Sequence, residues 1–582
     1  MDKSNKKKQS KNKLNEVTTF QVPFALGEIK ATISHPTQRS LSPNREKLIQ
    51  QAIKFHSEGN TSEAIKNYQY CINQGFNDYR VFSNYGAILK DLGKLQEAEI
   101  SVRKAIEIEP GLADAHSNLA GILKDLGKLK EAELSLRKAI KLKPGFADAH
   151  YNLGLILRDL GKFQDAELSQ IKAIKQKPDF AMAYSSLGNI LKDLGKLKEA
   201  ELSLRKAIKL KPELANSHYN LAITLTQIGK LKEAELSLLN AIELKPEFAE
   251  AYYSLSTMKD SKDIKRWKKH LFSENILNNK SNKEKTNIYF ARENLFYKEK
   301  KYKESSKCLK LANELKLATH PSKPEIYLNK SRILFSQSEK LVTIKKDYIH
   351  PPESIFIVGM PRSGSTLLES ILSMNKSVED LGEINILEDS YLEHKNSAKD
   401  LTLAELYWKK AFKYKNDSNI TTNKWLYNYQ YSAIIAKQIP NSKIIHCFRN
   451  PLDNILSIYR AHFAKGNEYS SSLVDCAKVY LDQDEIMTEY KKRFRSIIYD
   501  LNYDLLVLNP IKEIKSLIVW LGWQWDDSYL SPHLNTRSVL TRSNVEVRSP
   551  INSKSVGGWQ NYREMLQPVK EIIRKIEKYK NL

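Results

Sequence analysis

The sequence predicts an α-solenoid followed by an α/β domain with a parallel sheet. A helical motif recurs five times between residues 79 and 256, and from residue 350 short apolar runs alternate with helix-like sequence. The first of those runs leads into a glycine-containing loop of the kind that binds phosphate. Because 582 residues exceed what a single core holds, we expect a basic, disordered leader at 1–45, a solenoid at 46–345 and an α/β domain at 346–582.

The recurring motif has a fixed register, and its first copy reads DLGKLQEAEISVRKAIEIEP. Its glycines are Gly93, Gly127, Gly161, Gly195 and Gly229, and its prolines are Pro110, Pro144, Pro178, Pro212 and Pro246. This period of about 34 residues resembles the tetratricopeptide repeat, a helix–turn–helix unit. Each glycine is expected to open the turn, each proline to end the second helix, and a small residue such as Ala98 to let the helices approach closely. Degenerate copies flank the block on both sides, in FHSEGNTSEAIKNYQYCINQG and NLFYKEKKYKESSKCLKLANEL.

Stacked copies of such a repeat bury a continuous core and form a superhelix with a concave groove. We expect this groove to bind a protein or peptide acceptor. An asparagine recurs on the first helices, at Asn84, Asn118, Asn152 and Asn220. Its amide either lines the groove, where it can pair with a peptide backbone, or is simply hydrated.

The composition sets further bounds on function. A net charge of +25 and a pI near 9.4 suit a polyanionic ligand or an acidic partner. Much of the charge is diffuse lysine, so no nucleic-acid partner is expected. The lysine run near the start is interpreted as a solvated tail. Four distant cysteines match no zinc or disulfide spacing. No apolar h-region follows the basic start and no apolar run of about 18 residues occurs, so we expect no signal peptide or spanning helix and, by default, a cytoplasmic protein.

The stretch IFIVGMPRSGSTLLESIL, residues 355–372, predicts a strand, a phosphate-binding loop and a helix. Nucleotide triphosphatases read G-x-x-x-x-G-K-[ST] here, whereas this chain has Ser365 in place of the lysine. Successive backbone N–H groups and the helix dipole still form an anion site that needs no metal. The predicted site comprises Arg362, Ser363, Gly364, Ser365 and Thr366.

A second anion site is predicted in CFRNPLDNILSIYR. Arg449 ends a strand, and Ser457 lies about two turns into the following helix, so both side chains can reach one phosphate. Without the lysine and without an acidic magnesium ligand after this strand, triphosphate hydrolysis is unfavourable. Two separate phosphate sites instead suggest a donor that is phosphorylated at both ends.

The motifs PRSGST and RNPLDNILS resemble the 5′-phosphosulfate loop and the 3′-phosphate motif of the sulfotransferases. The resemblance implies 3′-phosphoadenosine 5′-phosphosulfate as the co-substrate, which needs neither a γ-phosphate lysine nor a metal. Within that superfamily the chain is most similar to the tyrosylprotein sulfotransferases and to bacterial proteins that join tetratricopeptide repeats to this domain. The similarity spans about residues 350 to 565.

The resemblance implies roles for four further residues. Glu383 stands where the family has its catalytic base, Lys424 at its catalytic lysine, Tyr503 at a donor-binding tyrosine and Ser543 near its catalytic serine. With these roles, Glu383 takes the proton of the acceptor hydroxyl. Arg362, Lys424 and Ser543 stabilise charge on the bridging oxygen of the donor. The plainer interpretations are a helix-surface acid, a solvated lysine and a loop serine.

The chain also departs from the family pattern. The arginine after the 3′-phosphate serine falls one place early, at Arg460, and the lysine before the tryptophan is Gly558, which Lys554 is a candidate to replace. The dipeptide Asp-Pro after the family's lysine is missing, since Trp425 and Leu426 follow instead.

Two other functions remain open on the sequence. A carbohydrate or lipid sulfotransferase would carry the same donor motifs. A repeat scaffold with an inactive α/β domain is the non-enzymatic alternative, although the retention of Arg362, Glu383, Lys424 and Arg449 together argues against it.

Overall fold

The computed structural model describes residues 43–258, 264–344, 346–396, 401–414, 419–463, 466–535, 537 and 545–582. Residues 1–42, which make up nearly all of the predicted leader, lie outside these ranges. The chain forms two compact units, Met1–Asn220 and Leu221–Leu582, and the division falls inside helix α11 (Ala215–Ile228).

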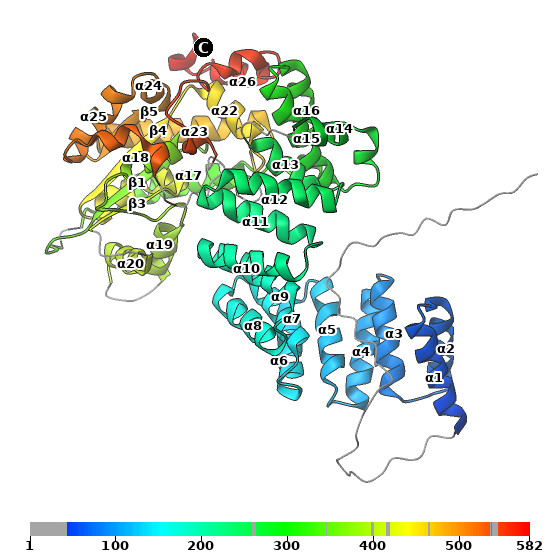
Figure 1. Ribbon diagram of the computed structural model, residues 1–582. Helices are drawn as coiled ribbons and strands as arrows, with labels where there is room; N and C mark the ends of the chain where they lie inside the picture. Colours follow the sequence, from blue (N-terminus) through cyan, green and yellow to red (C-terminus); the bar gives the residue numbers. More distant parts are fainter. Residues whose placement is uncertain are drawn as a thin grey trace, which may run out of the picture. The chain divides into compact units, whose positions relative to one another are not determined.

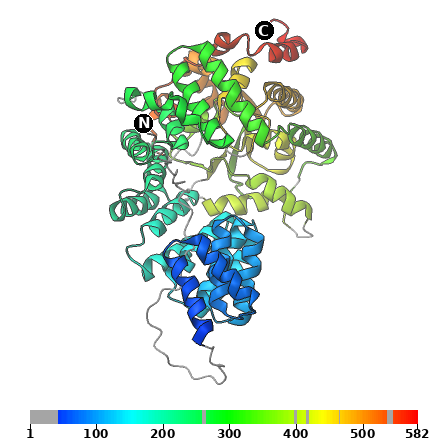
Figure 2. The same cartoon turned by 90° about the vertical axis from the view of Figure 1, so that its right-hand side faces the viewer.

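The first unit is a stack of paired helices (Figure 1), and Figure 2 shows its blue helices side by side. The pairs are α1 (Pro43–Ser57) with α2 (Thr61–Asn73), α3 (Tyr79–Asp91) with α4 (Leu95–Ile108), α5 (Ala113–Asp125) with α6 (Leu129–Leu142), α7 (Ala147–Asp159) with α8 (Phe163–Gln176), and α9 (Ala181–Asp193) with α10 (Leu197–Leu210). The predicted solenoid is confirmed, and its first helical pair contains the predicted degenerate copy FHSEGNTSEAIKNYQYCINQG.

The small residues of the repeat allow the close helix contact that the sequence predicts. Gly93 ends the turn after α3 with φ at 76°, which favours glycine. A Cβ at Gly86 would lie 2.5 Å from Val102 Cγ2 of the paired helix, so no larger residue fits. Ala98 on that helix is fully buried.

Three members of the asparagine series are buried, whereas Asn220 is partly exposed. Asn84, Asn118 and Asn152 are 3%, 7% and 2% exposed. The interpretation of these three amides as hydrated side chains is therefore wrong.

The second unit begins with helices and continues into the α/β domain. These first helices are α12 (Leu231–Leu244), α13 (Ala249–Thr257), α14 (Ile264–Leu271), the 3₁₀ helix η1 (Glu274–Leu277), α15 (Asn282–Lys298), α16 (Tyr302–Thr319) and α17 (Glu325–Lys340). The second degenerate copy predicted from the sequence is the pair α15 and α16.

A five-stranded sheet forms the centre of the α/β domain, and all of its pairs are parallel, as predicted. The strands are β1 (Glu353–Gly359), β2 (Val378–Asp380), β3 (Ile420–Asn423), β4 (Ser442–Phe448) and β5 (Ile498–Asn502), in the order β2-β3-β1-β4-β5. The chain therefore runs to one side of β1 for β2 and β3, and to the other side for β4 and β5. Such a switch point places the loops after β1 and β4 at one crevice, where ligands bind in open α/β sheets.

Helices cover both faces of this sheet. The helices of this domain are α18 (Ser365–Leu372), α19 (Ile386–Asn396), α20 (Leu403–Ala411), α21 (Ser432–Gln438), α22 (Pro451–Arg460), α23 (Leu473–Arg493), α24 (Tyr503–Leu508), α25 (Pro510–Leu521) and α26 (Gln567–Ile573). Short 3₁₀ helices connect them at η2 (Phe412–Tyr414), η3 (Leu426–Tyr431), η4 (Asp527–Leu530), η5 (Pro532–Leu534), η6 (Glu546–Arg548), η7 (Gly558–Tyr562) and η8 (Glu577–Tyr579). Ile355 and Ile357 pack with α18 and α25 on one face, while Phe356 and Val358 pack with α20, α21 and α23 on the other. This alternation explains why β1 is apolar along its whole length.

One predicted strand is shorter than its apolar run. The run YDLNYDLLVL is a strand only as far as Asn502, and the rest forms α24. The Asn502 side chain caps this helix by accepting from the backbone N–H groups of Asp504 and Leu505 at 2.9 and 3.2 Å. Within the described ranges, none of the helices combines the length and the apolar character needed to cross a membrane.

Candidate active site

The loop between β1 and α18 is held close to its neighbours by glycine. A Cβ at Gly359 would lie 2.2 Å from the carbonyl oxygen of Cys447 on β4. Gly364 has φ at 94°, and a Cβ there would lie 2.1 Å from the ring of Tyr503. Arg362 is also left-handed, with φ at 67°. Strain of this kind is common where a loop must present its backbone to a ligand.

The start of α18 presents backbone N–H groups without a capping side chain. Ser363, Ser365 and Thr366 are buried around it, at 1%, 5% and 6% exposure. The hydroxyl of Ser363 is enclosed and has no hydrogen-bond partner. An anion at the helix N-terminus would satisfy the uncapped backbone N–H groups, so this loop fits a phosphate or sulfonate group.

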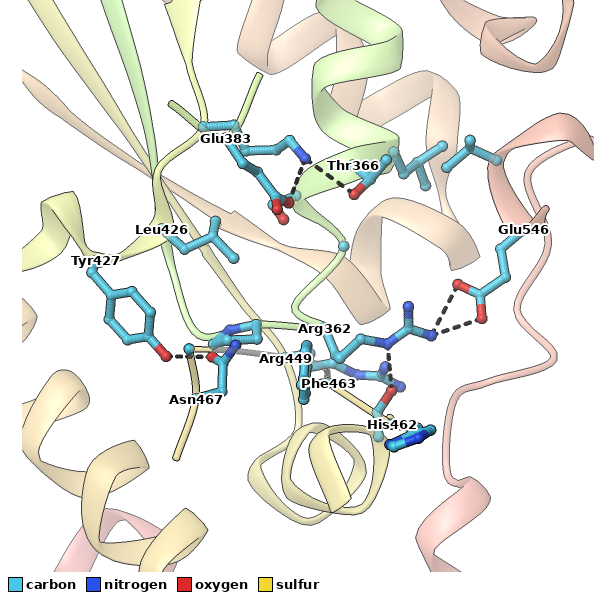
Figure 3. A pocket seen from close by; sticks show the side chains of 18 of the residues that line it. Arg362, Thr366, Glu383, Leu426, Tyr427, Arg449, His462, Phe463, Asn467 and Glu546 are labelled. Carbon is cyan, nitrogen blue, oxygen red and sulfur yellow. Dashed lines mark hydrogen bonds and ion pairs between the residues drawn. The ribbon is translucent and has the colours of Figure 1, made fainter. Parts of the chain in front are cut away.

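The second predicted anion motif borders the same cavity as the first. The Nε of Arg362 donates to the hydroxyl of Ser457 on α22 at 3.1 Å. Arg449, which follows β4, stacks over the ring of Tyr503 at 4.8 Å from its centroid and donates to the carbonyl oxygen of Ser555 at 2.7 Å. Figure 3 shows both guanidinium groups in this cavity. The fold thus brings together two motifs that lie about 90 residues apart in the sequence.

Two aspartates that the sequence reasoning missed support the second motif. Asp453 accepts from the backbone N–H groups of Gly557 and Trp559 at 2.7 and 2.9 Å and so fixes the C-terminal loop that carries Ser555. Burial raises the pKa of its carboxyl group. Asp504 accepts from the Asn450 N–H at 2.7 Å. Asp453 could have been noticed as the acid in the first turn after RNP.

A carboxylate and a lysine meet on the other side of the loop. Lys424 Nζ lies 2.9 Å from Glu383 Oε1 and 3.4 Å from the hydroxyl of Thr366 (Figure 3). The lysine side chain is 0% exposed, whereas the Glu383 side chain is 46% exposed and lines the cavity. Glu383 can therefore reach a ligand, while Lys424 holds it from behind.

A second carboxylate, that of Glu369 on α18, also pairs with Lys424, at 3.4 Å. Glu369 is buried, at 2% exposure. The sequence reasoning did not single it out. The sequence marks Glu369 only as the one charged residue in the mainly apolar run LLESIL.

Arg362 has a further partner that no motif indicated. Its Nη2 donates to both carboxylate oxygens of Glu546 at 2.7 and 3.0 Å. The Glu546 side chain is 60% exposed. The guanidinium predicted to meet the anionic end of a donor thus meets a solvent-accessible carboxylate in this structure (Figure 3).

Helices α15 to α17 complete the cavity, which has a volume of about 1320 Å³. They contribute polar and basic side chains, including Asn287, Lys316 and Lys330, opposite the sheet loops. A volume above the usual range of about 300–1,000 Å³ for small-molecule sites accommodates a nucleotide and an acceptor group together.

The misplaced arginine of the second motif, Arg460, ties these helices to α22. It donates to Glu293 on α15 at 2.8 Å, and its guanidinium lies 3.5 Å from the ring centroid of Tyr297. Glu293 is 0% exposed. Burial opposes the charge on Arg460, but the Glu293 carboxylate outweighs it and raises the pKa of the arginine.

Two predicted residues near the C-terminus have different outcomes. Ser543 lies outside the described residues. Lys554 lines the cavity, which keeps it a candidate for the lysine absent at Gly558.

Residues 352–402 and 385–527 match the model of the sulfotransferase family. Residues 79–111, 147–180 and 215–248 match the tetratricopeptide repeat, and 121–161 and 188–229 match a second model of that repeat. The chain carries a sulfotransferase-family domain behind tetratricopeptide repeats.

Relatives of the sulfotransferase domain and of the repeats are distant. An uncharacterized protein of Aquifex aeolicus is 29% identical over 265 residues, which cover 40% of this chain and only 35% of that relative. Protein-tyrosine sulfotransferase 2 of Gallus gallus is 22% identical over 259 residues, covering 39% of this chain and 70% of the relative. Among solved structures, YrrB, described as a TPR protein with an unusual peptide-binding site, is 22% identical and covers 32% of this chain and 96% of its own, with a TM-score of 0.28.

Proposed function

We propose that this chain transfers a sulfuryl group from 3′-phosphoadenosine 5′-phosphosulfate to an acceptor hydroxyl, with a protein tyrosine as the acceptor. The observation that carries the proposal is that both anion motifs and the Glu383 carboxylate border one cavity. An adenosine with phosphate at both ends needs two such motifs, and the transfer needs a base between them and the acceptor.

The donor's 5′ end fits the loop after β1. Its Arg362 guanidinium, and Ser365 and Thr366 at the N-terminus of α18, border the cavity and support the binding of one anion there. The 3′-phosphate fits beside Arg449 and Ser457, and the guanidinium of Arg449 stacks on the ring of Tyr503. Since the contacts of Arg449 and Ser457 act on the nucleotide portion, they serve donor binding more than the chemical step.

The transfer itself requires one proton movement and one exchange of bonds at sulfur. Glu383 takes the proton of the acceptor hydroxyl as the new S–O bond forms. The bond between sulfur and the bridging oxygen of the 5′-phosphate breaks, and its electron pair stays on that phosphate. Adenosine 3′,5′-bisphosphate leaves with the added negative charge, which Arg362 and Lys424 are placed to stabilise. Ser543 is proposed to add a further donor.

Tyrosine is proposed as the acceptor for two reasons. The relative from Gallus gallus, 22% identical, is a protein-tyrosine sulfotransferase. A phenol, with a pKa of about 10, loses its proton to a carboxylate more readily than an aliphatic alcohol does. The repeats are proposed to bind the acceptor protein or a partner that delivers it.

A two-step experiment tests the proposal. Calorimetric titration with adenosine 3′,5′-bisphosphate should show binding, and the labelled donor should transfer sulfate to a tyrosine peptide. Transfer to glycans or lipids instead would assign a different acceptor. No nucleotide binding at all would favour a scaffold with an inactive domain.

A further inference from the structure

The buried carboxylate of Glu369 stands behind the proposed transfer site. It belongs to α18, is 2% exposed, and does not line the cavity. One oxygen, Oε2, accepts from Arg537 at 3.0 Å and lies 3.4 Å from Lys424 Nζ. The other oxygen is enclosed without a hydrogen-bond partner. A buried acid with an unsatisfied oxygen is costly, so this position needs an explanation.

Glu369 is the middle member of a row of alternating charges. Asp380 pairs with Arg537 at 2.9 Å, Arg537 with Glu369 at 3.0 Å, Glu369 with Lys424 at 3.4 Å, and Lys424 with Glu383 at 2.9 Å. Only the last carboxylate in the row reaches the cavity (Figure 3). Both ends of the row are partly exposed, at Asp380 and Glu383, while Glu369 and Lys424 in between are buried.

We propose that Glu369 is a positioning residue that holds Lys424 in place while Glu383 works as the base. This inference rests on the proposed function. When Glu383 accepts the acceptor's proton it becomes neutral, and the fully buried ammonium of Lys424 loses its nearest counter-charge. An unpaired buried charge is strongly unfavourable. The Glu369 carboxylate, anchored by Arg537, stays 3.4 Å from the Lys424 ammonium as its second partner, so Lys424 still points at the loop and at the hydroxyl of Thr366.

A purely structural salt bridge would behave differently. Its loss would lower stability and disturb donor binding and turnover together. A positioning residue acts through Lys424, so its loss lowers kcat, leaves nucleotide affinity unchanged, and adds nothing once Lys424 itself has been removed.

The test uses Glu369→Gln, which keeps the shape and removes the charge. We expect kcat for sulfate transfer to fall about 10- to 100-fold, as for a misplaced catalytic group. The dissociation constant for adenosine 3′,5′-bisphosphate should stay within about twofold of wild type. Glu369→Gln combined with Lys424→Met should be no slower than Lys424→Met alone.

A matched control and a second variant complete the design. Glu353→Gln removes a carboxylate that pairs with Lys443 at 3.0 Å at the start of β1, away from the cavity, and should leave kcat unchanged. Glu369→Asp keeps the charge but shortens the arm, and should give a kcat between wild type and the glutamine variant. If the glutamine variant does not fold, the aspartate variant alone must show reduced kcat with unchanged nucleotide affinity.

The outcomes separate this inference from the proposed function. A wild-type kcat in Glu369→Gln, or effects of the Glu369 and Lys424 changes that multiply, would overturn the positioning role while transfer by the wild type stands. A wild type that neither binds nucleotide nor transfers sulfate would overturn both.

Discussion

The proposed nucleotide side of the cavity, around Arg362 and Arg449, and its proposed transfer side, around Glu383 and Lys424, hold charge in opposite ways. On the nucleotide side, Arg362 holds a carboxylate whose side chain is 60% exposed. On the transfer side, Lys424 is 0% exposed and lies between two carboxylates, one of them fully enclosed. The first partner can be exchanged for an incoming phosphate at little cost, because exposed ion pairs contribute little. The second arrangement is fixed before any ligand arrives, which is what electrostatic preorganisation requires.

The largest effect should follow from removing the base on the transfer side. Glu383→Ala should abolish turnover, a loss of about 10³-fold or more, while the affinity for adenosine 3′,5′-bisphosphate stays nearly intact. Single-turnover transfer of labelled sulfate and calorimetry measure the two quantities. Equal losses in both would make Glu383 a structural residue and would break the distinction between the two sides.

A smaller effect, of the opposite kind, is expected from the nucleotide side. Arg449→Ala should weaken donor binding about 10- to 100-fold, since charge-assisted hydrogen bonds contribute about 1.5–3 kcal/mol. Turnover at saturating donor should change by less than about threefold, because the contact is equally present before and during transfer. Arg449→Lys is the control, as it retains the charge without the fork geometry and should bind with intermediate affinity. A large fall in kcat with unchanged affinity would place Arg449 on the transfer side.

The smallest effect concerns the exchangeable partner. Glu546→Gln should tighten the binding of adenosine 3′,5′-bisphosphate, by about 2- to 5-fold, because an exposed pair contributes up to about 1 kcal/mol and the donor no longer has to displace it. The gain should shrink at high salt, since salt already screens the competing carboxylate. Weaker binding in this variant would instead mean that Glu546 orients Arg362 for the donor.

The sequence predicted those parts of the molecule whose signals are local or periodic. The repeats are recognised from glycines and prolines at fixed spacing. The loop after β1 is recognised from Gly359 and Gly364 between a strand-like run and a helix-like run. The parallel sheet followed from apolar runs that alternate with helices. The exception was the last run, where a capping side chain at Asn502 ended the strand earlier than its apolar sequence implied.

The contacts between distant segments could not be predicted. Glu369 and Arg537 are 168 residues apart in the sequence, and Arg362 and Glu546 are 184 residues apart. No spacing rule connects such pairs, because the fold alone brings them together. The same holds for Arg460, which looked like a motif residue out of register and proved to pair with Glu293, 167 residues earlier.

That buried pair has a consequence for how the chain can be divided. Glu293 has no exposure to water, and its arginine partner belongs to the helix that carries Ser457. A fragment that starts at residue 346 would leave this guanidinium without its counter-ion and uncover one wall of the cavity. Swapping repeats between relatives is therefore feasible only in the first unit, and the helices that line the cavity must stay with the sulfotransferase-family domain.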